Sequence, residues 1–301
     1  MGFLDRLIGG AGEPDPDAEA DVARIERGGI PLAAERRVRE LAGGETAFTS
    51  GLSVADFALS RLDGVQPVCQ VMGSSVYKVG WQNFPWGSTW GGGSLTELRP
   101  ITDAWNHARS LALARLEQEA RLAGCHAVVD VTFEGNRHEF LSGDIEIVVN
   151  GTAVRLPEET EAPVLTDLSL PDYTLLRRAG YRPVGVVAST SVFYIVPSLQ
   201  TRRATTGWQR LQANQELPDF TQGVYAAREM ALARATAQAR ELQAGGMIGV
   251  SIDHDIAIRE IDNGGKREDL IVTFHILGTA IAPAGEHLPI DPQLILRQGA
   301  K

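Results

Sequence analysis

Apolar residues recur at helical spacing in two long alanine-rich segments whose sequences nearly match. Six of eight positions are identical between ARSLALAR at 108–115 and AREMALAR at 227–234. Each segment leads into an apolar run, at 126–134 or 246–255, that is typical of a buried strand. A polar turn containing glycine follows each run. Each half then ends in a strand of alternating apolar and polar residues, 144–156 in the first and 270–282 in the second.

The stretches that precede these long helices also match, without gaps. LSVADFALSRLDGVQPV at 52–68 aligns with LSLPDYTLLRRAGYRPV at 168–184. The second residue of each is a serine, followed three residues later by an aspartate, a pattern that caps a helix N-terminus, and each short helix ends at a glycine. β-branched runs at 68–77 and 184–193 then predict strands. The chain therefore contains the same order of elements in both halves: short helix, strand, long helix, strand, strand.

This pattern predicts an α+β protein that consists of two tandem βαββ units behind an N-terminal helical arm. We expect the first long helix to begin at Thr102 or Asp103 and to end at Gly124, and the second to run from Phe220 to Gly245. We expect an acidic, helical arm at 1–50 and a first unit at 51–156. A linker at 157–167 should lead to a second unit at 168–283 and a tail at 284–301.

The arm contains a short apolar stripe and one helix with clear start and stop residues. The stripe is Phe3, Leu4, Leu7 and Ile8, and its simplest interpretation is a frayed helix that packs on the chain. The alternative is a small anchor for a partner protein; membrane contact through residues 3–8 is not expected, because so short a helix buries little area. The segment 28–44 predicts a helix that begins near Pro31.

Composition narrows the function classes. The net charge of −10 argues against a nucleic-acid partner, because phosphate contacts require a basic surface. No apolar run is long enough to cross a membrane, and MGFLDRLIGG lacks the features of a signal peptide. The two cysteines, Cys69 and Cys125, do not make a disulfide framework. A soluble, cytoplasmic protein is expected.

The passage ARLAGCHAVVDV at 120–131, together with GTAV at 151–154, resembles the YbjQ-like family, which is labelled heavy-metal-binding. The second half has the weaker counterparts ARELQAGGMIGV at 239–250 and GTAI at 278–281. The resemblance implies two tandem copies of a compact two-layer unit, similar also to dodecin-like units, that assemble into rings, usually pentameric. Where the family has Ala-Asp, this chain has Cys125-His126 in one half and Ala-Gly in the other.

Metal ligands are sparse in the sequence. No Cys or His residues occur in the close pairs that a zinc site needs. Cys125 and His126 are adjacent, so on a strand they would point to opposite faces. Asp253 and Asp255 share one strand face and could bind a hard cation if other oxygen ligands joined them. His275 matches Val148, which excludes a ligand role common to both halves. We expect no cofactor, with a divalent metal as the open alternative.

Catalytic motifs are absent, and the aromatic residues indicate binding instead. There is no nucleophile elbow and no phosphate-binding loop, so we expect a protein that is not an enzyme. Aromatic residues crowd the connection 80–94, and its counterpart 194–219 combines tryptophan with arginines, the residue types that dominate interfaces. The candidate partner-binding residues are Trp81, Phe84, Trp86, Trp90, Arg202, Arg203 and Trp208. A loop folded over its own core and a small-ligand pocket are the alternatives.

The apolar surface of the first long helix extends beyond the single stripe that one sheet would cover. Such a surface favours a homo-oligomer, with a pentamer the preferred stoichiometry, although packing within one chain could also use it. We expect the matched arginines Arg109 and Arg228, and Arg115 and Arg234, on the polar margins of the helices. The function expected is a non-enzymatic, ring-forming binding or scaffold protein that meets partners through the aromatic loop and the arm. The alternative is a metal or small-ligand sensor.

Overall fold

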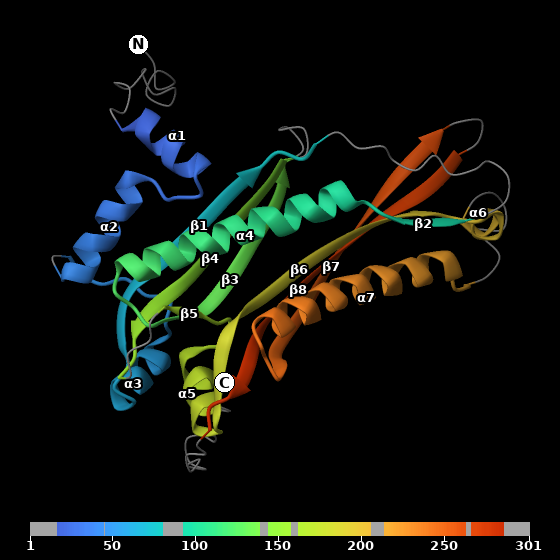
Figure 1. Ribbon diagram of the computed structural model, residues 1–301. Coiled ribbons are helices and arrows are strands. Elements are labelled where there is room, and N and C mark those ends of the chain that lie inside the picture. Colours follow the sequence, from blue (N-terminus) through green and yellow to red (C-terminus); the bar gives the residue numbers. More distant parts are fainter. Residues whose placement is uncertain are drawn as a thin grey trace.

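Two four-stranded sheets organise the chain (Figure 1). The computed structural model describes residues 17–44, 46–80, 93–138, 144–157, 162–205, 214–262 and 266–285. Sheet A has the order β1-β4-β3-β5, with bounds Gln66–Tyr77, Asp144–Arg155, Ala127–His138 and Val164–Leu165. Sheet B has the order β2-β6-β8-β7, with bounds Ser94–Glu97, Tyr181–Val196, Lys266–Pro283 and Gly246–Asp262. The α+β class predicted from the sequence is confirmed.

One long helix covers a face of each sheet (Figure 1). The helix α4 (Arg99–Leu122) packs on β1 and β4, and α7 (Pro218–Glu241) packs on β6 and β8. Among the described residues the remaining helices are α1, α2, α3, α5 and α6, at Ala18–Glu26, Leu32–Gly43, Val54–Leu62, Leu170–Arg178 and Leu199–Thr205. None of the described helices is both long enough and apolar enough to span a bilayer.

The two sheets share their irregularities as well as their strand order. In each, the last long strand lies between the other two, and all these pairs are antiparallel. The register of the first strand shifts just after Pro67 in β1 and just after Pro183 in β6. A bulge in the second long strand along the chain of each half places Asp130 of β3 at φ 55° and Gly249 of β7 at φ 64°. Aspartate tolerates this left-handed conformation, which suits glycine best.

The start of α4 differs from the sequence prediction. The helix begins at Arg99, with Pro100 in its first turn, rather than at Thr102 or Asp103. The Thr102 hydroxyl does not cap the helix, because it accepts a hydrogen bond from the backbone N–H of Val192 in β6 at 3.0 Å. The competing partner lies 90 residues away in the sequence, so the local pattern could not reveal it.

The arginines expected on helix margins are a second correction. Arg109 and Arg115 are only 6% and 9% exposed. Arg228 and Arg234, their counterparts in α7, are partly exposed. The reason is that α4 is covered on several sides, by sheet A, by the arm and by sheet B, whereas α7 buries one stripe of small residues: Gly223, Ala227, Ala231, Ala235 and Ala239. Packing within the chain therefore uses the surplus apolar surface of α4.

The arm lies beside β1 and is held there by buried polar contacts. Val38 of α2 is fully buried in the core under α4. The Arg115 guanidinium donates to the carbonyl oxygens of Ile25 and Gly29, both at 3.1 Å, and to that of Ser74 in β1. The segment expected to be a linker, 157–167, also joins the fold, because it contains β5, which pairs with β3 in parallel. The apolar stripe at residues 3–8 lies outside the described residues.

Candidate functional site

The first structural feature of the candidate site is the way α4 docks on the outer edge of β6. Strand β2 pairs with Phe193–Val196, and the chain then continues along the same edge into α4. The backbone N–H of Leu98 donates to the carbonyl of Val192 at 2.8 Å. The side-chain amide of Asn106 accepts from the N–H of Thr190 at 2.9 Å and donates to its carbonyl at 2.9 Å. The start of α4 thereby satisfies backbone groups that an edge strand would otherwise expose.

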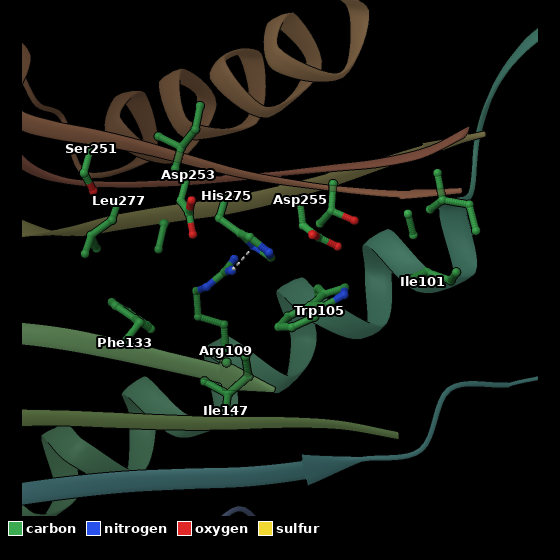
Figure 2. A pocket seen from close by; sticks show the side chains of 16 residues that line it. Ile101, Trp105, Arg109, Phe133, Ile147, Ser251, Asp253, Asp255, His275 and Leu277 are labelled. Atoms are coloured by element: carbon green, nitrogen blue, oxygen red, sulfur yellow. Dashed lines mark hydrogen bonds between the residues drawn. The ribbon is translucent and has the colours of Figure 1, made fainter. Parts of the chain in front are cut away.

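A cavity of about 390 Å³ lies beside this contact, between α4, sheet A and the face of sheet B that α7 does not cover (Figure 2). Its walls are aromatic and aliphatic on the sheet A side and polar along β7. Its lining includes Trp105, Arg109, Phe133, Asp253, Asp255 and His275. A volume above about 300 Å³ is typical of small-molecule sites.

Arg109 projects from α4 into this cavity (Figure 2). Its guanidinium contacts three neutral groups: the Oδ1 of Asn106 at 3.3 Å, the hydroxyl of Thr190, and the Nδ1 of His275 at 3.4 Å. No carboxylate of the described chain lies within ion-pair distance of it. Burial lowers the pKa of Arg109 to about 10, which leaves it positively charged at neutral pH.

His275 lies beside Arg109 and is neutral at pH 7. Its Nδ1 is 2.8 Å from the hydroxyl of Thr190, and its ring packs edge-on against Trp105 at a centroid distance of 4.9 Å. Burial, followed by the charge of Arg109, lowers the pKa of His275 to about 4, against a smaller opposing effect of Asp253. The imidazole therefore serves as a hydrogen-bond acceptor at the junction between α4 and sheet B.

The titration of His275 should make folding pH-dependent. Folding lowers the pKa of His275 from 6.5 to about 4. Its contribution to the free energy of unfolding is therefore complete above pH 6.5 and is lost as the pH falls through 4. The loss amounts to about 3 kcal/mol between pH 7 and pH 4. Denaturant unfolding of the wild type and of His275→Asn, which retains an acceptor but does not titrate, measures it as the difference between the two pH profiles. Parallel profiles would contradict the assignment.

The metal candidates do not form a metal centre. The Cys125 thiol is buried, which raises its pKa to about 12 and keeps it protonated, and it points to the carbonyl of Ala123 at 3.7 Å. The Nδ1 of His126 is engaged by the backbone N–H of Leu156 at 3.1 Å. The described residues contain no cluster of three or more His, Cys, Asp or Glu suited to an ion. Among the described residues, Cys125 and His126 therefore do not form the site that the heavy-metal label of the resemblance implies.

Asp253 and Asp255 share a strand face, and both line the cavity. Asp253 lies opposite His275 in the β7–β8 ladder and Asp255 lies opposite Thr273. Both aspartates are exposed. Their position makes them part of a pocket wall that also contains a neutral imidazole and a buried guanidinium.

The candidate partner-binding residues divide into two groups. Trp81, Phe84, Trp86, Trp90 and Trp208 lie outside the described residues. Arg202 and Arg203 lie on α6, where Arg203 is exposed and the Nε of half-buried Arg202 donates to the carbonyl of Pro197 at 2.9 Å. The structure does not bring these two arginines into the cavity.

Sequence reasoning missed Trp105 and Arg109, and it set His275 aside because its counterpart is Val148. The available signal was the difference between the two halves. Within otherwise matched segments, Trp105 and Asn106 stand where the second half has Val224 and Tyr225. Trp105 lines the cavity and Asn106 bonds to Thr190 of β6, so these two differing positions lie where the halves meet, whereas Arg109, which matches Arg228, gave no such signal.

Comparison with known proteins identifies one relative that matches most of the chain and others that match a part of it. The family model YbjQ_1, described as "Putative heavy-metal-binding", matches residues 88–157. The encapsulin nanocompartment protein Rv1762c of Mycobacterium tuberculosis is 33% identical over 275 residues, which span 88% of this chain and 96% of that protein. The UPF0145 proteins TTHA1944 and TT_C1581 of Thermus thermophilus are each 42% identical over 65 residues, 22% of this chain and 55% of theirs. No solved structure matches the chain. The chain therefore carries a YbjQ_1 domain and belongs to the family of the encapsulin nanocompartment protein Rv1762c.

Proposed function

We propose that this chain is a tandem pair of YbjQ-like units that assembles into a ring and serves, without catalysis, as a cytoplasmic binding or scaffold component of an encapsulin-type compartment. The observation that carries the proposal is the docking of β2 and the start of α4 on the β6 edge. This contact joins the segment of the first unit that contains β2 and the start of α4 to the edge strand of the second unit, in a head-to-tail manner. A head-to-tail contact repeated between chains closes a ring when its rotation permits.

The segment that docks in this contact, the start of a long helix, has a counterpart at the start of α7. Glu216, Leu217 and Thr221 occupy the positions of Glu97, Leu98 and Thr102. Unlike Leu98 and Thr102, they make no hydrogen bond to a strand among the described residues. The Thr221 hydroxyl instead donates to Glu216 at 3.0 Å. The neighbouring Tyr225 is 55% exposed, which leaves this end of α7 accessible to another chain.

The strand edge on which that segment docks, the outer edge of β6, also has a counterpart, the outer edge of β1. Glu119 accepts from the N–H of Met72, as its counterpart Gln238 accepts from that of Ala188 in β6. No described segment pairs with the β1 edge as β2 pairs with β6. Met72 and Val76, on the face of β1 away from α4, are 44% and 64% exposed. In this proposal the start of α7 from a second chain meets this edge, where the Ser74 carbonyl, the counterpart of that of Thr190, already accepts from Arg115.

The arm and the aromatic loop belong to the same surface in this proposal. The arm lies beside β1, and residues 80–94 follow β1 directly in the sequence. A chain arriving at the β1 edge would therefore meet the arm, and the tryptophans of the loop are the residue type that stabilises such contacts. The preferred stoichiometry is a pentamer, as the family resemblance implies.

The absence of catalysis in the proposal is supported by the geometry around His275. Its hydrogen bond to Thr190 is the pairing that a nucleophile and its base would make. Thr190, however, is fully buried and does not line the cavity, so no substrate could reach its hydroxyl. The pair is better explained as a structural contact of the junction.

Assembly is tested by placing a charge at the start of α7. Tyr225→Glu puts a carboxylate where the counterpart residue, Asn106, lies within the docked contact, so we expect native mass spectrometry to show smaller species than the wild type forms. Ala233→Glu is the matched control, because its counterpart Ala114 stays exposed on α4. A wild type that is monomeric at micromolar concentration, or equal effects of the two variants, would overturn the assembly.

Association with a compartment is tested by sedimentation of the wild type and of the Tyr225→Glu variant. We expect the tagged wild type, expressed in an encapsulin-bearing host, to sediment with the large shell particles rather than with free ring oligomers. The Tyr225→Glu variant reports whether this association needs assembly. Recovery of the wild type solely in fractions of its own oligomer would refute the compartment role while leaving the ring intact.

A further inference from the structure

Arg109 is a buried positive charge without a counter-charge in the described chain. It is 6% exposed, and its hydrogen-bond partners among the described residues, Asn106, Thr190 and His275, are neutral. A guanidinium carries five N–H donors, so three single contacts leave donors unused. Burying an unpaired charge is costly, and proteins normally offset it with an ion pair. In this molecule the uncompensated group faces a cavity, where a ligand could supply the missing anion.

We propose that the cavity at the junction of the sheets binds a small organic monoanion, whose carboxylate pairs with Arg109 and whose apolar body lies between Trp105 and Phe133. The guanidinium lies over the ring of Phe133 at 5.8 Å, so one wall of the site orients its planar fork. Gly135 and Ile147 of sheet A and Ile271 and Leu277 of β8 complete an apolar lining. Such a lining buries a body of the size of a phenyl or short alkyl chain.

The remaining polar groups select the charge of the ligand. Asp253 and Asp255 line the wall on β7 and repel a second negative charge. His275 is neutral and adds a hydrogen-bonding atom rather than a charge. The site therefore favours one carboxylate over a dianion such as a phosphate monoester. This inference concerns a cavity within a single chain and does not depend on ring assembly.

Binding is tested on the full-length chain by isothermal titration calorimetry at pH 7. The probes are 3-phenylpropanoate and hexanoate as monoanions, phenethylammonium as a cation with a similar body, and phenyl phosphate as a dianion. We expect saturable binding of at least one monoanion with a Kd of about 1 mM or tighter. The cation and the dianion should bind at least about tenfold more weakly. No saturable binding by either monoanion, or equal binding of the cation, overturns the proposal.

Variants locate the site. Arg109→Gln should weaken monoanion binding at least about tenfold, because a charge-assisted hydrogen bond is lost. Arg228→Gln is the matched control: it changes the corresponding arginine of α7, which lies outside the cavity, and should leave the affinity unchanged. Equal affinities of Arg109→Gln and the wild type overturn the assignment.

A second variant decides the question if Arg109→Gln does not fold. The double substitution Asp253→Asn and Asp255→Asn affects two exposed side chains and should leave the fold intact. Removing their repulsion should tighten monoanion binding about two- to fivefold and should raise the affinity for phenyl phosphate by a larger factor. An unchanged or weakened affinity for the monoanion would overturn the proposal on its own.

Discussion

Replacing Gly73 with serine is expected to destabilise the fold by about 4 kcal/mol or more. A Cβ atom at this position of β1 would overlap the carbonyl oxygen of Ala112 and would lie 2.7 Å from the backbone nitrogen of Leu116 in α4. Both obstacles are backbone atoms of a packed helix, so no side-chain rotation relieves them. Denaturant unfolding monitored by circular dichroism measures the change.

The corresponding position of sheet B explains why serine is the informative substitution. There the residue is Ser189, whose hydroxyl donates to the carbonyl of Ala231 in α7 at 2.8 Å. The helix α7 thus leaves room for a side chain that α4 excludes. Gly246→Ser serves as the control, because a Cβ there meets no atom within 4 Å, and it should change the unfolding free energy by less than about 0.5 kcal/mol. A Gly73→Ser variant as stable as this control would refute the close approach of α4.

Replacing Asp269 with asparagine is expected to cost about 3 to 5 kcal/mol. Asp269 in β8 is fully buried and accepts from the Tyr194 hydroxyl at 2.6 Å and from the Arg267 guanidinium at 2.7 Å. The substitution leaves Arg267, itself nearly buried, as an uncompensated charge. Unfolding in guanidinium chloride, compared with that of the exposed-site variant Asp255→Asn, measures the loss.

The titration of Tyr194 provides an independent check of this cluster. Burial, followed by the hydrogen bond and the charge of Asp269, raises the pKa of Tyr194 to about 12. Because its pKa is raised by folding, the contribution of Tyr194 is complete below pH 10 and is lost as the pH rises towards 12. In Asp269→Asn the phenol should ionise at lower pH in an ultraviolet titration. An unchanged titration curve would show that the two groups do not interact.

Local signals predicted the capped short helices, the two long helices and the six long strands, since local physics creates them, but they did not predict α1, α6 or the short strands β2 and β5. Ser53 and Ser169 cap their helices as expected, each accepting from the backbone N–H of the aspartate three residues later. Alternation placed Ile145, Ile147 and Val149 on one buried face of β4. These features depend on residues within a few positions of one another, and the chain displays them directly.

The candidate site could not be predicted in the same way, because its residues come from distant parts of the chain. Arg109 and His275 are separated by 166 positions, and Thr190 lies between them. His275 gave no local signal, since an imidazole in an alternating strand is compatible with many environments. Its role depends on the packing of sheet B against α4, which periodicity does not encode.

The two arginines at matching positions of the long helices separate the contributions of sequence and tertiary structure. The alanine-rich pattern around Arg109 and Arg228 is nearly the same, and it determines that both segments are helices that follow a first strand and precede a second. Tertiary structure alone decides that Arg109 is buried against β6 and β8 while Arg228 stays partly exposed. The physical reason is that α4 docks on the edge of β6 and carries Arg109 into the cavity beside it, whereas α7 packs on one face of β6 and β8 with a stripe of small residues that does not include Arg228.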